Sequence, residues 1–82
     1  MFNKIAEAQA LPNYRLDVRF CNGEAKRYDV SVLFAAYPAF RAFQNAEAFF
    51  QSVQVDVGGY AVVWSDELDL SYNELYENGT AC

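Results

Sequence analysis

Residues 53–79, VQVDVGGYAVVWSDELDLSYNELYENG, decide the fold because they place a glycine hairpin, an apolar strand and a capped helix in strict order. The pair Gly58 and Gly59 suits a two-residue primed turn, in which both central residues need a positive φ. Such a turn sets every large apolar side chain of the hairpin on one face, in three pairs: Val57 with Tyr60, Val55 with Val62, and Val53 with Trp64. We therefore predict a hairpin with Trp64 largely buried.

The helix that follows carries a signal at each end. Ser71 is a typical N-cap, and Glu74 completes a capping box at the third helical position. Leu70 and Leu75 occupy the two positions of a hydrophobic staple, and Gly79 follows the end of the helix. The sequence therefore predicts a short C-terminal helix that begins after Ser71.

Residues 14–30 predict another hairpin, for which two turn lengths are plausible. A two-residue turn would place Val18 opposite Arg27 and so mix apolar and charged side chains on one face. A three-residue loop over residues 21–23, with Gly23 left-handed, gives two uniform faces. Its pairs are Leu16 with Tyr28, Tyr14 with Val30, Asp17 with Arg27, and Arg15 with Asp29. We favour the three-residue loop.

The rest of the chain predicts shorter elements. Residues 4–10 predict a first strand, and Ser31 is placed to cap a helical turn over residues 32–34. Residues 38–43 predict a second short helix with Pro38 in its first turn, and Asn45 is placed to cap a third over residues 46–51. Helices of this length are unstable alone, so we expect them to pack on the sheet.

Together these elements predict one α+β domain over residues 1–82. We expect a mainly antiparallel sheet of four or five strands in two hairpins, with short helices packed on one face and a short C-terminal helix. The composition is that of a globular protein, with 54% hydrophobic and 21% charged residues. Apolar runs are far shorter than a membrane span and residues 1–11 lack the apolar core of a signal peptide, so we expect a cytoplasmic protein without a membrane partner.

The order of several short motifs resembles a known bacterial family, called "domain of unknown function 2442". The motifs are Tyr28-Asp29-Val30-Ser31, Val62-Val63-Trp64, Leu68-Asp69-Leu70-Ser71 and Leu75-Tyr76, with a phenylalanine-rich helical middle, and the likeness covers roughly residues 5–79. The resemblance implies an α+β domain with no established activity and no catalytic residues to transfer. It also implies members that occur alone or joined to a helix-turn-helix domain, often encoded beside a second small protein in pairs that resemble toxin–antitoxin modules. We expect no helix-turn-helix here, since the chain ends soon after the capped helix.

Several kinds of catalysis lack their usual residues. The chain contains no histidine, the commonest general base and metal ligand, and no phosphate-binding or dinucleotide glycine motif. Asp66, Glu67 and Asp69 lack the spacing of a calcium loop. Cys21 and Cys82 are expected to be free thiols without a catalytic role. We therefore expect no enzyme, no cofactor and no metal site.

Charge is distributed unevenly along the chain. All six basic residues lie in the first 41 positions, while the second half holds seven acidic residues and no basic one. Three tyrosines lie near these acids, and aromatic side chains are common in interfaces. We therefore predict an acidic, aromatic partner-binding face comprising Tyr60, Asp66, Glu67, Tyr72, Tyr76 and Glu77.

The function that we favour is a non-enzymatic protein-binding module, an antitoxin-like partner of a small basic protein. The alternative is a nucleic-acid-associated regulator that uses the basic hairpin residues Arg15, Arg19, Lys26 and Arg27. Pairing of those residues with acids across the strands makes nucleic acid the less favoured partner. Surplus aromatic side chains and strand edges also predict a weak homodimer, with a monomer as the other outcome.

Overall fold

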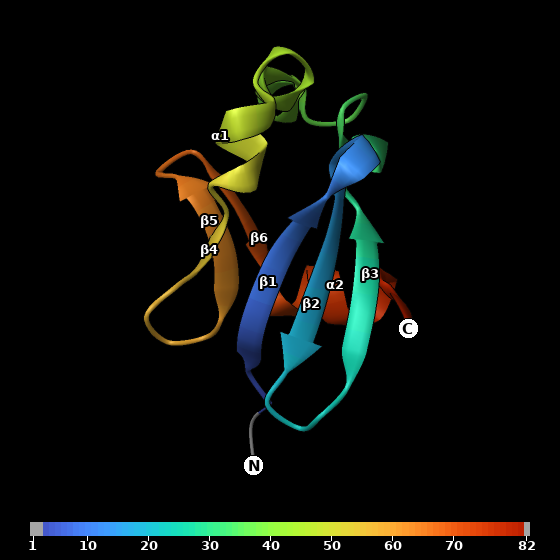
Figure 1. The fold of residues 1–82 in the computed structure, drawn as a ribbon, viewed down its shortest axis with the longest axis vertical. Helices are drawn as coiled ribbons and strands as arrows, with labels where there is room; N and C mark the ends of the chain where they lie inside the picture. Colours follow the sequence, from blue (N-terminus) through green and yellow to red (C-terminus); the bar gives the residue numbers. More distant parts are fainter. Residues whose placement is uncertain (1–2, 82) are drawn as a thin grey trace.

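The computed structural model describes residues 3–81, which form two antiparallel sheets and several short helices. The first sheet contains four strands in the order β1 (Ile5–Leu11), β2 (Arg15–Phe20), β3 (Ala25–Asp29) and β7 (Thr80–Ala81). The second contains three strands in the order β4 (Gln54–Val55), β5 (Ala61–Ser65) and β6 (Leu68–Ser71). The predicted α+β class is confirmed, although the strands form two sheets side by side instead of one (Figure 1).

The hairpin of β2 and β3 has the predicted three-residue loop. Gly23 has a φ of +93°, and its N–H donates to the Phe20 carbonyl oxygen at 3.0 Å. This left-handed glycine lets the three-residue loop turn the chain back, so that apolar side chains of both strands stay on the same face of the sheet. The register confirms three predicted pairs: Leu16 with Tyr28, Asp17 with Arg27, and Arg15 with Asp29.

The predicted pair of Tyr14 with Val30 does not form, because the chain turns sharply before β2 begins. Asn13 and Tyr14 both adopt the left-handed region, with φ of +65° and +61°. Asparagine tolerates that conformation, whereas a bulky aromatic residue rarely adopts it. Tyr14 is held there by the Phe34 ring, 5.3 Å away between centroids, and by the Gln44 carbonyl oxygen, which accepts from its hydroxyl at 3.1 Å. Tertiary contacts thus outweigh the local backbone preference.

In the second sheet the predicted register is confirmed where Val55 pairs with Val62, but the turn is wider than predicted. Only Gly59 of the glycine pair has a positive φ, +76°. Asp56 closes the loop, because its carbonyl oxygen accepts from the Gly59 N–H at 3.1 Å and its carboxylate accepts from the Tyr60 N–H at 2.9 Å. The side chains predicted to pair at the turn are exposed instead: Val57 and Tyr60.

Strands β6 and β7 were absent from the sequence prediction for different reasons. In β6, buried leucines alternate with exposed Asp69 and Ser71, so a strand pattern is present but overlaps the acidic turn and the helix entry. The two residues of β7 carry no pattern, and their strand exists because Thr80 pairs with Arg27. Gly79 permits this pairing, since a Cβ there would lie 2.5 Å from the Leu75 carbonyl oxygen.

Three short helices connect the sheets: the 3-10 helices η2 (Val30–Leu33) and η3 (Pro38–Asn45), and α1 (Glu47–Gln51). Their positions match the prediction, but both predicted caps are wrong. Asp29, and not Ser31, caps η2. It directly precedes Val30, the first residue of the helix, and its carboxylate accepts from the Ser31 N–H at 3.0 Å. Ala46 precedes α1 and gives it no side-chain cap, so Asn45 ends η3 instead. Packing, and not capping, therefore holds α1 in place.

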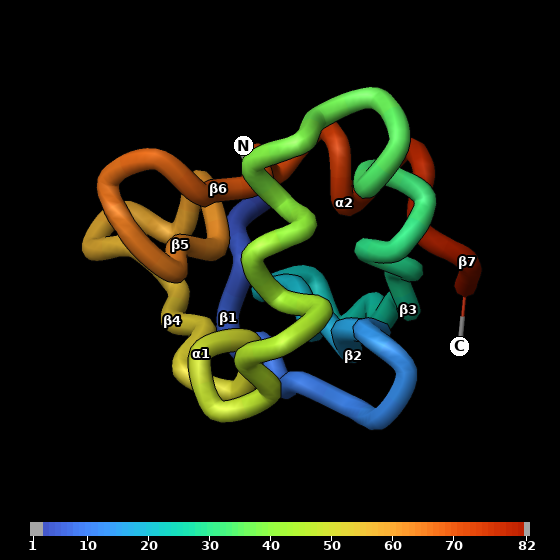
Figure 2. Tube along the Cα trace, turned by 90° about the horizontal axis from the view of Figure 1, so that it is seen from above, coloured from blue at the N-terminus to red at the C-terminus, as the bar shows by residue number. Residues whose placement is uncertain are grey.

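Trp64 is 9% exposed, as predicted, and lies at the centre of an aromatic cluster. Its ring lies 4.9 Å from that of Phe43 and 6.0 Å from that of Phe50 between centroids, and its Nε1–H donates to the Phe50 carbonyl oxygen at 2.9 Å. The indole N–H is thus satisfied inside the core. Seen from above, η3 and α1 cross the end of the molecule over both sheets (Figure 2).

The C-terminal helix α2 (Tyr72–Asn78) lies behind β2 and β3, on the buried side of the first sheet (Figure 1). The Ser71 hydroxyl accepts from the Glu74 N–H at 3.2 Å, which confirms the predicted N-cap. Buried Leu75 fixes the face of the helix that points into the core.

We predict that Ser71→Ala lowers the free energy of unfolding by about 0.5–2 kcal/mol, because a helix N–H loses its acceptor. Ser71→Asp, which keeps an acceptor at the same position, should retain most of the stability. Urea denaturation followed by Trp64 fluorescence measures both variants. Equal midpoints for Ser71→Ala and the unaltered chain would show that this cap does not stabilise the helix.

Candidate functional site

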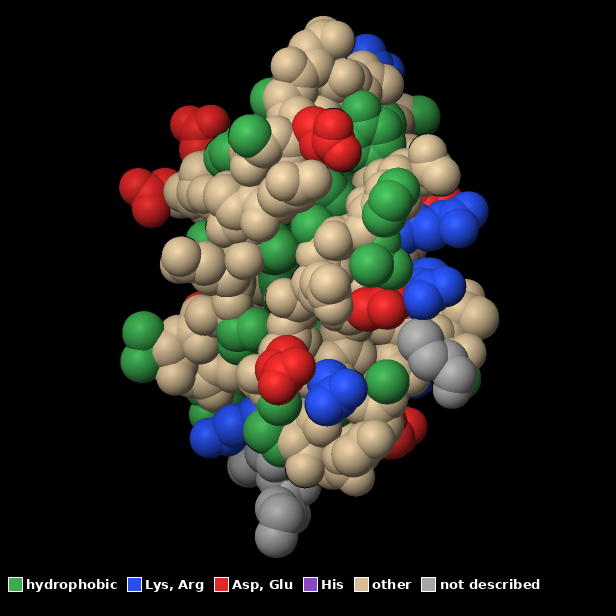
Figure 3. Space-filling view, in the orientation of Figure 1, with side chains coloured by type: hydrophobic (Ala, Val, Ile, Leu, Met, Phe, Trp, Pro, Cys, Tyr) green, Lys and Arg blue, Asp and Glu red, His purple; other side chains and the backbone are tan. Residues whose placement is uncertain are grey.

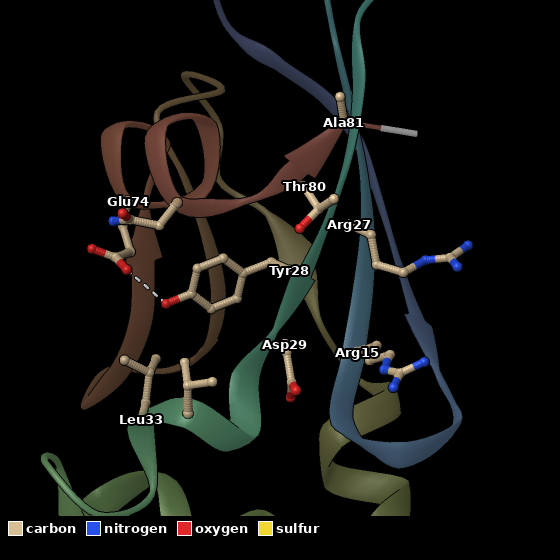
Figure 4. A pocket seen from close by; sticks show the side chains of 10 residues that line it. Arg15, Arg27, Tyr28, Asp29, Leu33, Glu74, Thr80 and Ala81 are labelled. Atoms are coloured by element: carbon tan, nitrogen blue, oxygen red, sulfur yellow. Dashed lines mark hydrogen bonds between the residues drawn. The ribbon is translucent and has the colours of Figure 1, made fainter.

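A cleft of about 820 Å³ opens where the edge of β3 meets η2, α2 and β7 (Figure 4). Its size is within the range typical of ligand pockets, about 300–1,000 Å³. The walls combine apolar and acidic groups, from Val32, Leu33, Asp29 and Glu74. Val32 is 64% exposed, which is unusual for a branched apolar side chain beside a recess. This cleft is the main candidate site of the described chain.

Tyr28 and Glu74 meet inside the cleft across elements that are 46 residues apart. The Tyr28 hydroxyl donates to Glu74 Oε2 at 2.6 Å (Figure 4). Burial, and then the carboxylate beside it, raise the pKa of the Tyr28 hydroxyl above its usual value. Glu74 was predicted to complete a capping box with Ser71, but its carboxylate contacts β3 instead. This bond therefore fixes the back wall of the cleft.

Each of the two cleft carboxylates has one oxygen committed to a protein contact. Asp29 Oδ1 accepts from both the N–H and the hydroxyl of Ser31, and Glu74 Oε2 accepts from Tyr28. Among residues 3–81, no partner is recorded for Asp29 Oδ2 or Glu74 Oε1. From the sequence, both residues were assigned to structure alone, Asp29 to a cross-strand pair and Glu74 to a capping box.

The side chains of Arg15 and Arg27 point away from Tyr28, toward the other side of the strands (Figure 4). The pleat explains this, because neighbouring residues of a strand face opposite sides and Tyr28 faces inward. Arg27 is bound to Asp17, with Nε 2.7 Å from Oδ1, and this bond lowers the pKa of the Asp17 carboxyl. The guanidinium groups thus lie at the rim of the cleft and leave its interior acidic.

The predicted partner-binding residues do not form one surface. Asp66 and Glu67 lie in the turn between β5 and β6, whereas Tyr60 lies at the opposite end of β5. At about 3.3 Å per strand residue, the chain from Tyr60 to Asp66 spans roughly 20 Å. The remaining members of the predicted face lie on α2: Tyr72, Tyr76 and Glu77. The structure thus separates the acidic turn from the tyrosines.

Tyr72 and Tyr76 are largely used in packing. Their rings stack 5.3 Å apart between centroids, and Phe20 meets both rings edge-on. The Tyr76 hydroxyl donates to Glu24 at 2.5 Å, which raises the pKa of Tyr76 and lowers that of Glu24. Lys26 Nζ donates to the Tyr76 carbonyl oxygen and lies 4.1 Å from the centroid of its ring. These tyrosines therefore join α2 to the first hairpin.

The predicted nucleic-acid residues are also divided. Lys26 faces α2, whereas Arg15, Arg19 and Arg27 lie on the outer face of the first sheet, each opposite an acid or beside one. The acids on that face are Glu7, Asp17 and Asp29. Figure 3 shows basic and acidic side chains next to one another over β1 to β3. Three bases against three acids give this face no net charge, and nucleic acid requires a positive one.

The second half of the chain is acidic throughout. Residues 42–81 contain seven carboxylates and no Lys or Arg. Within residues 3–81, the ion pair that the structure records joins Arg27 to Asp17, so these carboxylates have no cation partner there. Asp69 lies on the exposed face of β6, an edge strand of its sheet. Like charges would meet, and repel, if two copies paired at this edge. The weak homodimer is not tested by the structure of a single chain and stays a prediction.

Other candidate chemistry gains no support. The described part of the chain contains no group of three Cys, Asp or Glu side chains placed to share a metal ion. Cys21 is an exposed free thiol in the first hairpin loop, and Cys82 lies outside the described residues. No helix within residues 3–81 has the length and apolarity to cross a membrane.

Fold and site together define a small α+β domain with an acidic half and a cleft at a sheet edge. The chain belongs to the family described as "Protein of unknown function (DUF2442)", whose model matches residues 5–81. A crystal structure from Nitrosomonas europaea, named "Putative DNA Binding Protein NE0471", shares 25% sequence identity and a TM-score of 0.78. The similarity covers 95% of this chain and 49% of that one, so this chain spans about half the length of its neighbour. The search of curated proteins gives no match.

We predict that the domain loses stability as the pH rises above about 10. The folded state holds the Tyr28 proton above the usual tyrosine pKa of 10.0, while the unfolded state releases it there, so folding is disfavoured as pH rises. Tyr28→Phe should remove this component and should cost about 1.5–3 kcal/mol near neutral pH through loss of the bond to Glu74. Denaturant melts of both chains between pH 8 and pH 11 measure the difference. Parallel pH profiles would contradict the prediction.

Proposed function

We propose that this chain is a non-enzymatic protein-binding module, an antitoxin-like partner of a small basic protein in the cytoplasm. The observation that carries the proposal is the separation of charge: the seven carboxylates of residues 42–81 have no recorded cation partner within the described chain. Concentrated like charges keep a protein soluble, but they also repel one another within the folded chain. A basic partner would relieve that repulsion and associate faster because of it.

The hairpin of β5 and β6 gathers three exposed acidic side chains. Asp66 and Glu67 are exposed in its turn, and Asp69 is exposed on the adjoining strand. Cross-strand neighbours share a face, so half-buried Val63 lies beside Asp69 and adds apolar surface to the charged one. Apolar area beside a charged rim is the usual composition of a protein interface.

The second candidate is the nucleic-acid-associated regulator, which gains support from the name of the Nitrosomonas europaea protein. Half of that protein has no counterpart in this chain, so its name does not assign the activity to the shared half. The outer face of the first sheet balances three arginines with three acids. A protein partner is therefore the better supported reading.

The test compares two variants of equal net charge. Asp66→Asn/Glu67→Gln removes two charges at the hairpin, and Glu7→Gln/Glu47→Gln removes two outside the predicted partner-binding face. With the product of the neighbouring gene as the partner, the hairpin variant should slow association about threefold to tenfold and weaken its dependence on salt. The control variant should change both much less. Stopped-flow or biosensor kinetics at two ionic strengths measures these rates.

Equal association rates for the two variants would reject the hairpin as the contact surface. Binding of short duplex DNA with a steep salt dependence, and no binding to the neighbouring gene product, would favour the regulator instead.

A further inference from the structure

The cleft beside β3 offers one carboxylate oxygen inside it that no described group satisfies, Glu74 Oε1, and a second at its outer edge, Asp29 Oδ2. We propose that this cleft receives a lysine or arginine side chain of the basic partner. The inference deepens the proposed function and rests on it. It assigns to the cleft the one contact in which a cation is enclosed, while the acidic hairpin contributes attraction over longer distances.

The chemistry of the walls matches a long cationic side chain along its whole length. Val32 and Leu33 present apolar surface on one side, which suits an aliphatic stem. The charged head would reach Glu74 farther in, beside the ring of Tyr28, while Asp29 lies at the outer edge (Figure 4). Hydrogen bonds between a guanidinium or ammonium group and a carboxylate are among the strongest in proteins.

The Tyr28 hydroxyl fixes the sign of the charge that fits. It donates its proton to Glu74 Oε2, so that carboxylate acts as an acceptor and is already held in place for a second donor at Oε1. An anionic ligand would face the Glu74 carboxylate in the interior, while the side chains of Arg15 and Arg27, which line the outer part of the cleft, point away from Tyr28 (Figure 4). Arg27 is moreover engaged by Asp17. The cleft therefore selects a cation.

The volume limits how much of a partner can enter. About 820 Å³ holds one long side chain with its flanking backbone, and it is too small for a helix. The edge of β3 is paired by β7 at Lys26 and Arg27, and the recorded pairing stops there. Beyond Arg27 the antiparallel register leads toward Gly79 and Asn78, so the side chain would enter the cleft without adding a strand to β3.

The direct test uses a small probe on the whole chain. N-acetyl-L-arginine methylamide is titrated into ¹⁵N-labelled protein, and its neutral isostere N-acetyl-L-citrulline methylamide is titrated in parallel. The arginine probe should shift the amide signals of Asp29, Glu74 and Asn78, with a millimolar dissociation constant expected for so small a ligand. The citrulline probe should leave those signals in place.

Two substitutions then distinguish binding in the cleft from a general effect of net charge on the affinity. Glu74→Gln keeps an acceptor for Tyr28 but removes the charge, and it should lower the affinity for the arginine probe about tenfold. Glu47→Gln makes the same charge change at an exposed position of α1 and should change the affinity less than twofold. Asp29→Asn, which retains the η2 cap oxygen, provides a second cleft variant if Glu74→Gln unfolds.

Equal shifts with both probes, or equal affinities for the Glu74→Gln and Glu47→Gln variants, would overturn the inference. That failure is distinct from failure of the proposed function. The partner would then still bind with rates that depend on Asp66 and Glu67, but its affinity would not respond to Glu74→Gln. An arginine probe that shifts only signals of the β5–β6 turn would likewise place the cation contact outside the cleft.

Discussion

The fold depends on Trp64, which joins the second sheet to the short helices in the middle of the chain. Its ring packs on Phe43 and Phe50, and its N–H donates to the Phe50 carbonyl oxygen. The helices that carry those phenylalanines are too short to persist alone. The strand register shifts at Trp64, between Val63 and Ser65, and such a bulge redirects a side chain. One indole thus holds the middle segment across the end of both sheets.

Hairpin registers could be predicted from the sequence because a shift of one residue reverses every side chain of a strand. Leu16 faces Tyr28 and Val55 faces Val62 for that reason, and both pairs were predicted. Ser71 was predicted as a cap because capping is a local property of a few residues. The predicted pair of Tyr14 with Val30 failed because tertiary contacts, and not the local sequence, decide the backbone of Tyr14. Tyr14 adopts an unfavourable backbone only because residues 20 and 30 positions away hold it.

The candidate site could be predicted in composition but not in position. Acidic residues and tyrosines cluster in the sequence, yet strand β5 carries Tyr60 and Asp66 to opposite ends of a hairpin. The cleft has no sequence signal of its own, since Tyr28 and Glu74 meet only after α2 packs behind β3. Residues that sequence reasoning had assigned fully to structure, such as Asp29, line its wall. A site at a junction of distant elements is visible only once the elements are placed.

The distribution of charge separates the two candidate functions more clearly than the shared fold does. A fold hosts many activities, so similarity to half of a longer protein leaves the partner open. In the first sheet, Arg27 is bound to Asp17 and Arg15 lies opposite Asp29, so its charges are balanced within the sheet itself. The carboxylates after residue 42 have no such compensation among the described residues. The basic protein that we propose as the partner would compensate these charges, whereas a nucleic acid, whose phosphates carry the same sign, would not.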